Sequence, residues 1–502
     1  MRRAINPVGL NLPVVLICLA SFLSLAPAAS AATRHVSIVG LDSSPCTQLL
    51  PCASFERAYG VSAPGDVIEV ASGSYRSQDI PAITGRSGTP VIFRPASGAS
   101  VTVAHIDVYG THVELRDFRV TGGWYVRTGA SFVTLRNLVA TSTVYITSAS
   151  DIRVIGGSVG PADGKDPQIK AANTTGAALP RDILIDGVDF HDFTRNSNPS
   201  AHVECLQVGA ADGITIRNSR FRNCETQGLF LKSWGGTAKI RDVVIENNFF
   251  DATTVGYYAI HMGDQDGQII ENVRIAYNSS LQPFNVDADA ATNVEFVGNH
   301  APRNRHACTA DQRYAFNVWD AAACSATDVT APLRFVDPGA MDLRPRSDSA
   351  AIDGGDASDY PDGDIDGRSR FAGRGPDAGA SEFGAPSTSP PPPPPAPAPP
   401  PAPAPAPPPP SSSVGITFTS PAEGKVFTDH LYLAVAITGT TEIERVKFYD
   451  GTRLLITDYG EPWQYGWRPY HTIANGAHTL TAVLMTTGGE TARDTVSVTR
   501  VP

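Results

Sequence analysis

The sequence predicts an all-β protein in which a long parallel β-solenoid precedes a small C-terminal β-sandwich. Short segments recur with apolar residues at their first and third positions, which is the period of a β-strand. Between residues 113 and 298 these segments start 19 to 31 residues apart. A proline-rich run then separates the repeat from a second group of short alternating strands. The repeat predicts a solenoid, and the second group predicts a separate domain.

The repeated segments share one strand and one sharp bend. They begin at Val113, Val133, Ile152, Ile183, Ile214, Val243, Val273 and Val294. Their fifth residues are Asp117, Asn137, Gly156, Gly187, Asn218, Asn247, Tyr277 and Gly298. All except the tyrosine are turn formers that tolerate left-handed backbone conformations. We therefore expect stacked coils that share one core, with asparagines hydrogen-bonding from coil to coil. The alternative, an antiparallel β-sandwich, predicts no such register.

Segments at both ends of the repeat would close a solenoid. The entry segment, HVSIVGLDSSPCTQLLPCASFERAYG, is expected to contain a helix after Ser54, followed by PGD, the strand VIEV and a turn at GSY. The exit segment runs from LRPRSDSAAIDGG to DAGASEFG. Such caps cover coil edges that would otherwise recruit other strands. With these caps, residues 34–384 resemble the secreted right-handed parallel β-helix proteins of the pectin-lyase-like group. The resemblance implies a right-handed parallel β-helix.

The C-terminal part divides into a linker and a second domain. Residues 385–413 form a proline-rich linker, which is expected to be extended polyproline II. Residues 414–502 contain the strand-like segments ITFTSP, LYLAVAI, ERVKFYDG, HTLTAVLM and TVSVTRV. Turns at Asp450-Gly451 and Asn475-Gly476 predict hairpin corners. This part, which includes Trp467, resembles the bacterial immunoglobulin-like (Ig-like) modules of exported proteins, and the resemblance implies an Ig-like β-sandwich.

The N-terminus predicts export. Arg2 and Arg3 precede the apolar run VVLICLASFLSLA, and small residues at Ala29 and Ala31 fit a signal peptide over residues 1–31. An uncleaved membrane anchor is one alternative. Lipidation at Cys18 is another, although the bulky preceding isoleucine disfavours it. We expect a secreted protein, extracellular or associated with the cell surface, with no transmembrane anchor after cleavage.

Charge and cysteine content narrow the class of protein. The formal net charge is −11, which argues against binding nucleic acid. Capture of an acidic polymer would need calcium or a local basic patch. An even number of cysteines after the signal peptide suggests disulfides in an exported protein. Local pairing is preferred among the possible connectivities, which gives Cys46 with Cys52, Cys205 with Cys224, and Cys308 with Cys324. Cys205 is then structural rather than a nucleophile. We expect a monomer.

The candidate site lies in the longer coils, between Ile152 and Val273. Two stretches are expected to leave the solenoid as loops, residues 160–180 and 191–202, and such loops often carry function. Aligning ECLQVG, GLFLKSW and YAIHMGD places Gln207, then Phe230 or Lys232, then His261 in adjacent coils. The candidate catalytic residues are Lys232, His261 and Glu204. The candidate substrate-binding residues are His202, Gln207, Trp234 and Asp264.

Two reactions fit these residues. In the related β-helix lyases, a basic side chain removes the proton next to a uronate carboxylate while calcium or arginine neutralises the carboxylate. This implies Lys232 or His261 as the base, provided that burial or nearby charge lowers its pKa. A hydrolase would instead need two carboxylates, with Glu204 as one of them. The alternative for each residue is a solvated side chain without a catalytic role.

Other motifs limit these expectations. The NTD, DD and GHG series of the polygalacturonases is missing, and so is a clear cluster of calcium-binding aspartates followed by the lyase arginine. DGDIDG, residues 362–367, starts like a calcium loop, but the twelfth position is Gly373 instead of glutamate. We interpret its aspartates as turn and cap formers. No cofactor is certain, and calcium is the one candidate.

The sequence therefore predicts a secreted β-helix protein that engages extracellular or cell-wall polysaccharide, as a lyase or a glycoside hydrolase. The alternative is a non-catalytic surface or adhesion scaffold that binds a polymer or a protein partner. Convergence of Lys232, His261 and Glu204 in one cleft would favour an enzyme.

Overall fold

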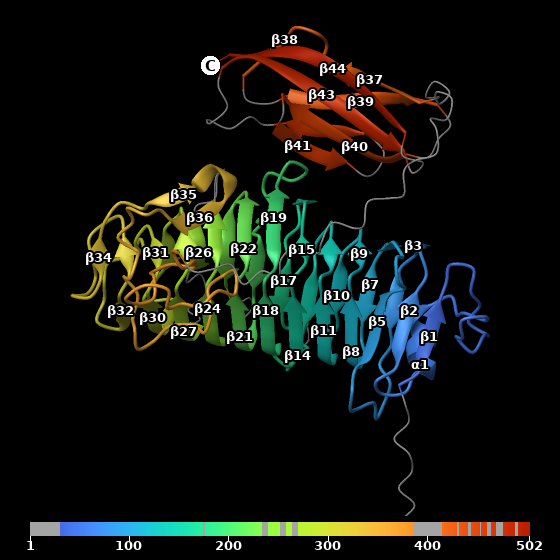
Figure 1. Ribbon diagram of the computed structural model, residues 1–502, viewed down its shortest axis with the longest axis horizontal. Helices are drawn as coiled ribbons and strands as arrows, with labels where there is room; N and C mark the ends of the chain where they lie inside the picture. The colour runs from blue at the N-terminus through green and yellow to red at the C-terminus, as the bar shows by residue number, and fades with distance from the viewer. Residues whose placement is uncertain are drawn as a thin grey trace, which may run out of the picture.

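The computed structural model (Figure 1) describes most of the chain. The described residues are 31–173, 176–232, 239–251, 258–263, 270–384, 414–428, 431–439, 443–451, 453–458, 463–467, 475–486 and 490–501. The proline-rich linker, Trp234, Asp264 and all but the last residue of the predicted signal peptide lie outside them.

Three parallel sheets run along the length of the first domain, and the coils from β2 to β29 contribute strands to sheet A, then sheet B, then sheet C. Sheet A contains β1 (Thr33–Val36), β2 (Val67–Val70), β5 (Val91–Pro95), β8 (Thr111–Arg116), β11 (Ser131–Arg136), β14 (Ser150–Ile155), β18 (Arg181–Asp186), β21 (Ala211–Arg217), β24 (Ile240–Glu246), β27 (Ile270–Ala276), β30 (Ala291–Val297) and β32 (Gln312–Ala315). Sheet B contains β3 (Gly73–Tyr75), β6 (Val101–Val103), β9 (Arg119–Val120), β12 (Val139–Ala140), β15 (Ser158–Val159), β16 (Ala162–Asp163), β19 (Asp189–Thr194), β22 (Arg220–Cys224), β25 (Phe249–Asp251), β28 (Ser279–Ser280), β31 (His300–Ala301), β33 (Val318–Trp319) and β34 (Val329–Thr330). Sheet C contains β4 (Gln78–Ile80), β7 (Ile106–Val108), β10 (Trp124–Val126), β13 (Tyr145–Thr147), β17 (Gln168–Lys170), β20 (Leu206–Val208), β23 (Gln227–Leu231), β26 (Tyr258–Met262) and β29 (Phe284–Val286). The first domain is therefore a parallel β-helix.

The repeat found in the sequence corresponds to sheet A. The eight aligned starting residues pair with one another in a continuous register from Val113 to Val294, and all of them are buried. All eight fifth residues have positive φ, from 52° at Asn137 to 72° at Gly187. Tyr277 is the one fifth residue that is not a usual turn former, and it too has positive φ, 53°. Its hydroxyl accepts from the backbone N–H of Asp356 at 2.9 Å. The bend thus requires a left-handed residue in every coil, whatever the side chain.

A buried asparagine ladder follows the bend between sheets A and B. Nδ2 of Asn248 donates to Oδ1 of Asn278 at 3.0 Å, and Nδ2 of Asn278 donates to Oδ1 of Asn299 at 3.1 Å. Asn299 donates in turn to Asn317 Oδ1 at 2.9 Å, and Asn317 ends the ladder on Asp328 at 3.0 Å. The ladder lies one residue after the predicted corner position. It satisfies backbone groups at the bend, where sheet hydrogen bonding is interrupted.

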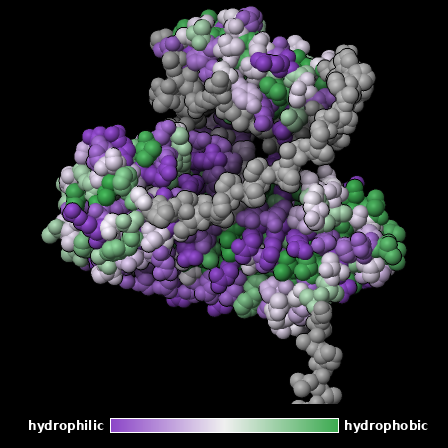
Figure 2. All heavy atoms as spheres, viewed as in Figure 1, coloured by the Kyte–Doolittle hydropathy of each residue, from purple (hydrophilic) through white to green (hydrophobic). Residues whose placement is uncertain are grey.

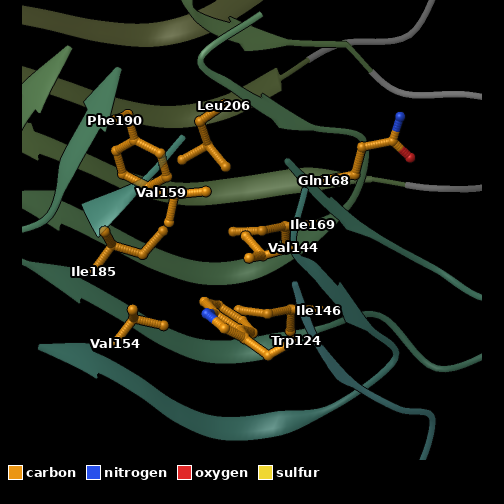
Figure 3. A pocket seen from close by; sticks show the side chains of 10 residues that line it. All are labelled: Trp124, Val144, Ile146, Val154, Val159, Gln168, Ile169, Ile185, Phe190 and Leu206. Carbon is orange, nitrogen blue, oxygen red and sulfur yellow. The ribbon is translucent and has the colours of Figure 1, made fainter. Parts of the chain in front are cut away.

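Apolar side chains from all three sheets fill the interior, as Figure 3 shows for the middle coils around Trp124 and Leu206. These side chains leave a void of only about 10 Å³, which is no larger than the space needed for one water molecule. The amide of Gln168 points away from this apolar group in Figure 3. Ligand contacts must therefore be made on outer faces of the β-helix, where side chains such as Gln168 lie.

The entry cap contains the predicted helix. Helix α1 (Phe55–Val61) begins after Ser54, whose side chain accepts from the backbone N–H of Arg57. The expected turn at GSY was wrong: Gly73–Tyr75 is strand β3, because this coil also needs a sheet B strand and Tyr75 fills the interior. Exposed apolar side chains gather at this end of the β-helix (Figure 2), and the most exposed is Leu49 at 91%.

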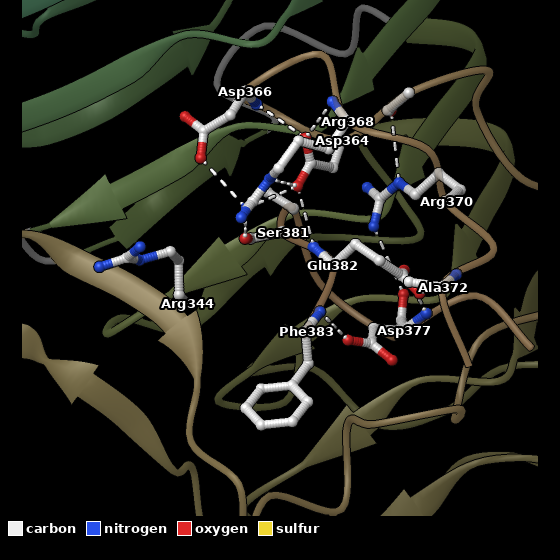
Figure 4. Close-up of polar contacts among 12 residues, drawn as sticks. Arg344, Asp364, Asp366, Arg368, Arg370, Ala372, Asp377, Ser381, Glu382 and Phe383 are labelled. Carbon is white, nitrogen blue, oxygen red and sulfur yellow. Dashed lines mark hydrogen bonds and ion pairs between the residues drawn. The ribbon is translucent and has the colours of Figure 1, made fainter. Parts of the chain in front are cut away.

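The exit segment packs against the last coils. β35 (Phe335–Asp337) and the 3-10 helix η1 (Pro338–Ala340) lead into it, and β36 (Asp342–Pro345) lies at its start. Asp364, from the DGDIDG stretch, accepts backbone N–H groups from Asp366, Arg368 and Glu382 (Figure 4). Arg370 is fully buried and donates to the carbonyl oxygen of Gly379 at 2.8 Å. The aspartate at 364 thus forms turns, as interpreted from the sequence.

The two predicted loops are partly strands. Residues 160–180 contain β16 and the sheet C strand β17, and residues 191–194 belong to β19. β16 and β17 have two and three residues, which is too short to show a period, so the sequence pattern missed them. The three predicted disulfides are present, and Cys205–Cys224 has a Cα–Cα distance of 5.3 Å. None of the described helices is long and apolar enough to cross a membrane.

The C-terminal domain is an antiparallel β-sandwich with its own core. One sheet contains β37 (Gly415–Ser420), β39 (Leu431–Thr438) and β42 (Gln464–Trp467). The other contains β38 (Lys425–Phe427), β40 (Ile443–Asp450), β41 (Arg453–Asp458), β43 (Gly476–Thr486) and β44 (Thr491–Arg500), and only β38 pairs in parallel. Asp450-Gly451 turns the β40–β41 hairpin as predicted. Asn475-Gly476 joins no hairpin, because β42 and β43 lie in different sheets.

Candidate functional site

One line of side chains crosses sheet C on its outer face, and we call it the outward row. Each member pairs in register with its neighbour in the next coil, and in most of these strands the residues on either side of the member point into the core. The outward row consists of Asp79, Asp107, Tyr125, Tyr145, Gln168, Gln207, Phe230, His261 and Asn285. Parallel strands place successive members about 4.8 Å apart along the axis.

After the exposed Asp79 and the half-buried Asp107, the outward row becomes aromatic and is flanked by cations. The rings of Tyr125 and Tyr145 lie 4.7 Å apart, and both residues are half-buried. Arg127 lies over the Tyr125 ring at 4.5 Å, and Lys170 lies over the Tyr145 ring at 4.7 Å. Lys170 also donates to Gln168 Oε1 at 2.9 Å. This stretch presents ring faces, hydrogen-bonding groups and the positive charge of Lys170, whereas Arg127 is paired with Asp107, the preceding row member.

The centre of the outward row is covered. Gln207 is 4% exposed, Phe230 3% and Lys232 8%, although the first two belong to the outer face. The register confirms that Gln207, Phe230 and His261 lie in adjacent coils. It assigns the middle position to Phe230 rather than Lys232. Gln207 and Lys232 therefore offer little surface to a ligand.

His261 is held by the coil before it. Its Nδ1 lies 2.7 Å from Oε1 of Gln227, and its ring lies 4.9 Å from that of Phe230. Burial lowers the pKa of His261 to about 4, with further lowering by the charges of His306, Lys232 and His202. At neutral pH the imidazole is therefore uncharged and a weak base, poorly matched to removing a proton from carbon.

Asp166 and Glu204 form a buried carboxyl pair beside the outward row. Asp166 lies two residues before Gln168, and its Oδ1 accepts a hydrogen bond from Gln168 Nε2 at 3.1 Å. Glu204 comes from the next coil and is fully buried. The two carboxyl groups hydrogen-bond to each other. The pair therefore lies where the open part of the row meets its covered centre.

The surroundings of Glu204 leave one oxygen without a donor. Thr226 Oγ1 lies 3.4 Å from Oε1 of Glu204, and His202 Nδ1 lies 3.6 Å from the same oxygen. Among the described residues, Oε2 has no hydrogen-bond partner that donates to it. A proton held between Glu204 and Asp166 would supply the missing donor. The His202 side chain is 70% exposed, so it lies at the edge of the site.

The pKa values of both carboxyl groups are raised toward neutral pH. Burial raises the pKa of Glu204 to about 7. Burial and then repulsion from Glu204 raise the pKa of Asp166 to about 7. The nearby cation Arg195 acts in the opposite direction on Glu204, but its Nε lies 3.5 Å from Glu225 Oε1. Near pH 7 the pair holds about one proton, so it contains both an acid and a base.

The structure thus brings part of the predicted site together. His202 contacts Glu204, while His202 and Lys232 lie close enough to His261 to lower its pKa. Trp234 and Asp264 lie outside the described residues. Sequence reasoning missed Asp166, Tyr125 and Tyr145. The signal that could have found the tyrosines is their position between two apolar residues in WYV and VYI.

Metal binding stays a prediction. Within the described ranges, no group of three or more His, Cys, Asp or Glu side chains is placed to hold a metal ion. Asp264 and Asp266, which the sequence places next to this region, are outside those ranges.

Comparisons with known proteins assign a family to the C-terminal domain alone. No curated protein matches the chain. Among solved structures, the pectate lyase Pel9A is 16% identical, with 70% of this chain and 97% of that chain covered and a TM-score of 0.42. A rhamnogalacturonan lyase is 12% identical, with 61% of this chain and 91% of that chain covered and a TM-score of 0.34. The fibronectin(III)-like modules of Clostridium thermocellum CbhA are 24% identical, with 17% of this chain and 93% of that chain covered and a TM-score of 0.16.

These TM-scores are low, so the fold assignment rests on the strand pairing described above. Residues 415–482 match the family model described as a bacterial Ig domain. The chain therefore joins a parallel β-helix to a bacterial Ig domain.

Proposed function

We propose that the β-helix binds an extended polysaccharide along the outward row and cleaves it, as a lyase or a glycoside hydrolase. The observation that carries this proposal is the stretch from Tyr125 through Tyr145 to Gln168, which ends beside a carboxyl pair. Sugar rings present flat C–H faces that pack on aromatic rings, and their hydroxyl groups need hydrogen-bonding partners. One pyranose unit is close in length to the spacing between coils. A linear chain parallel to the axis can therefore contact the same kind of position in each coil.

The charges favour an acidic polymer over a neutral one. The chain has a net charge of −11, yet Arg127 and Lys170 lie over the two tyrosine rings of the open stretch. Arg305, beyond the covered centre, lies over the Tyr258 ring at 5.6 Å. Arg127 is also paired with Asp107, so Lys170 and Arg305 supply the positive charge that an acidic polymer requires on an acidic protein. The predicted secretion and the three disulfides fit an extracellular substrate.

Cleavage distinguishes this proposal from a non-catalytic scaffold. The protein without its first 31 residues is incubated with neutral and uronate-containing polysaccharides, with and without calcium, and the products are analysed by mass spectrometry. Fragments lighter by one water than hydrolysis products would establish a lyase, and hydrolysed fragments would establish a glycoside hydrolase. Binding without fragments would leave the scaffold as the function. Absence of both binding and cleavage across the panel would contradict the proposal.

A further inference from the structure

We propose that Asp166 is the general acid that protonates the glycosidic oxygen of the bound polysaccharide, and that Glu204 is a buried positioning residue that shares its proton. This inference rests on the proposed function, because it requires a polysaccharide on the outward row. It adds an acid that is the same for both reactions, since elimination and hydrolysis each release a sugar oxygen that needs a proton.

The position of Asp166 fits contact with substrate. Its carboxyl is hydrogen-bonded to Gln168, and Gln168 is the row member that follows Tyr145 in the next coil. Lys170 donates to the same glutamine. A sugar packed on Tyr145 therefore has its next glycosidic bond over the coil that carries Asp166. Asp166 is 7% exposed, whereas Glu204 is 0% exposed, so only Asp166 can touch a ligand from the row.

Glu204 is more deeply buried than Asp166 and affects the reaction only through it. Its Oε1 contacts Thr226 and His202, and its Oε2 meets no donor from the described residues. Among the described residues, the charged groups near Glu204 include His202 at the solvent edge and Arg195, which is itself paired with Glu225. A second carboxyl next to Asp166 favours a protonated state at neutral pH, because two buried carboxylates in contact repel each other. This is the condition a general acid needs.

The separation of the two carboxyls excludes a different role for the pair. A glycosidase that uses two carboxyls needs them about 5–5.5 Å apart for retention or about 6.5–9.5 Å apart for inversion. The carboxyls of Asp166 and Glu204 are in hydrogen-bonding contact, which is closer than either arrangement. The pair therefore supplies one proton and does not supply a separate nucleophile or base on the opposite face of the sugar.

The proton transfer balances in both reactions. The C–O bond to the leaving sugar breaks, its electron pair stays on the oxygen, and the proton of Asp166 moves to that oxygen. In hydrolysis, the proton released by the attacking water restores the pair. In elimination, the proton removed from the carbon next to the uronate carboxylate replaces it through solvent. No oxidant, reductant or further reactant is needed.

The experiment compares Asp166→Asn and Glu204→Gln with Asp212→Asn, which lies on sheet A and pairs with Arg241 at 2.7 Å. Circular dichroism first verifies that each variant folds. D166N should lower kcat by about 100-fold or more, with KM and polysaccharide binding nearly unchanged. It should recover most of its activity on a substrate with a nitrophenolate leaving group, which needs no acid. E204Q should move the alkaline limb of the kcat profile to lower pH. D212N should change neither kcat nor the alkaline limb of its pH profile.

Carboxyl titration by ¹³C NMR gives a readout that needs no substrate. In the wild type, one carboxyl of the pair should lose its proton near pH 7, and in E204Q the titration of Asp166 should move to lower pH, because the repulsion from Glu204 is removed while burial remains. Ordinary titration of both carboxyls near pH 4 would overturn the inference even without a known substrate. D166N activity within a few-fold of wild type would overturn it while the proposed function stands. Binding without cleavage by the wild type would also overturn the acid role, whereas absence of binding would contradict the proposed function itself.

Discussion

Nδ1 of His261 lies 2.7 Å from Oε1 of Gln227, which belongs to the preceding coil. An amide oxygen only accepts hydrogen bonds, so Nδ1 carries the ring proton and Nε2 does not. Nε2 faces the backbone at Gly263, where an added Cβ would lie 2.6 Å away. Burial lowers the pKa of His261 to about 4. The residue is thus held as a neutral ring in one tautomer, which suits hydrogen bonding better than base catalysis.

The first prediction is that His261 stays neutral from about pH 5.5 to 8, with its proton on Nδ1. Long-range ¹H–¹⁵N NMR would show this directly, and loss of the signal in His261→Gln would assign it. Gln227→Leu removes the acceptor, so the signal should change to a mixture of tautomers. A titration of His261 near its ordinary value of about 6.5 would contradict the prediction and restore it as a candidate base.

The second prediction concerns the aromatic stretch of the outward row. Tyr145→Ala removes a ring that lies between Tyr125 and Lys170. We expect weaker polysaccharide binding by about 1–2 kcal/mol, which is about 5- to 30-fold. Tyr145→Phe should retain most of the affinity, because the ring face remains. Affinity electrophoresis or calorimetry would measure the change.

A matched control is available for this variant. Tyr360 is 40% exposed and lies in the exit segment, next to Asp359, which pairs with Arg274 of sheet A. Tyr360→Ala removes the same ring from a different face of the β-helix. Equal losses of affinity in the two alanine variants would argue against the outward row as the binding surface.

The sequence predicted sheet A better than the other two sheets, for a physical reason. Sheet A strands of six or seven residues show a clear alternation, and their corners need left-handed residues such as Asn137 and Gly187. The sheet C strands β13 and β17 have only three residues each, which is too short for a period to show. The whole repeat and its register were therefore predictable, whereas β17 was expected to be a loop.

The candidate site was predictable only in part. Glu204 and His202 were chosen from one polar stretch, and the structure places them in contact. Asp166 belongs to a stretch that was expected to be a loop, so nothing in the sequence placed it beside Glu204. Burial decides the chemistry of such a pair, and burial depends on how coils stack. Motif spacing carries no information about it.

The third prediction tests the asparagine ladder. Asn299 is fully buried, donates to Asn317 and Ile275, and accepts from Asn278. Asn299→Ala should destabilise the β-helix by about 3 kcal/mol or more, because several buried partners lose their hydrogen bonds. Thermal unfolding followed by circular dichroism would show the lower midpoint. Asn196→Ala, at an exposed position, should change stability by less than about 0.5 kcal/mol. A comparable effect of both variants would show that the ladder adds no particular stability.

The last prediction is a pH dependence of stability that arises from the carboxyl pair. Asp166 and Glu204 have pKa values of about 7 in the folded protein, and both would return to about 4 on unfolding. The folded state therefore holds a proton more tightly than the unfolded state. The stabilisation from this proton is complete below about pH 4 and is lost as the pH rises through about 7.

Glu204→Gln replaces one carboxyl of the pair with an amide that can donate at any pH, so it should reduce this loss. We therefore expect the unfolding midpoint of E204Q, relative to wild type, to rise as the pH increases from 5 to 8. Asp212→Asn is the control, because the pKa of Asp212 is lowered instead of raised. Pairing with Arg241 lowers it, so the carboxylate is ionised throughout this range. The difference between D212N and wild type should stay constant from pH 5 to 8. If the difference between E204Q and wild type stays constant as well, the two carboxyls do not share a proton, because a proton bound only in the folded state must appear in the pH dependence of unfolding.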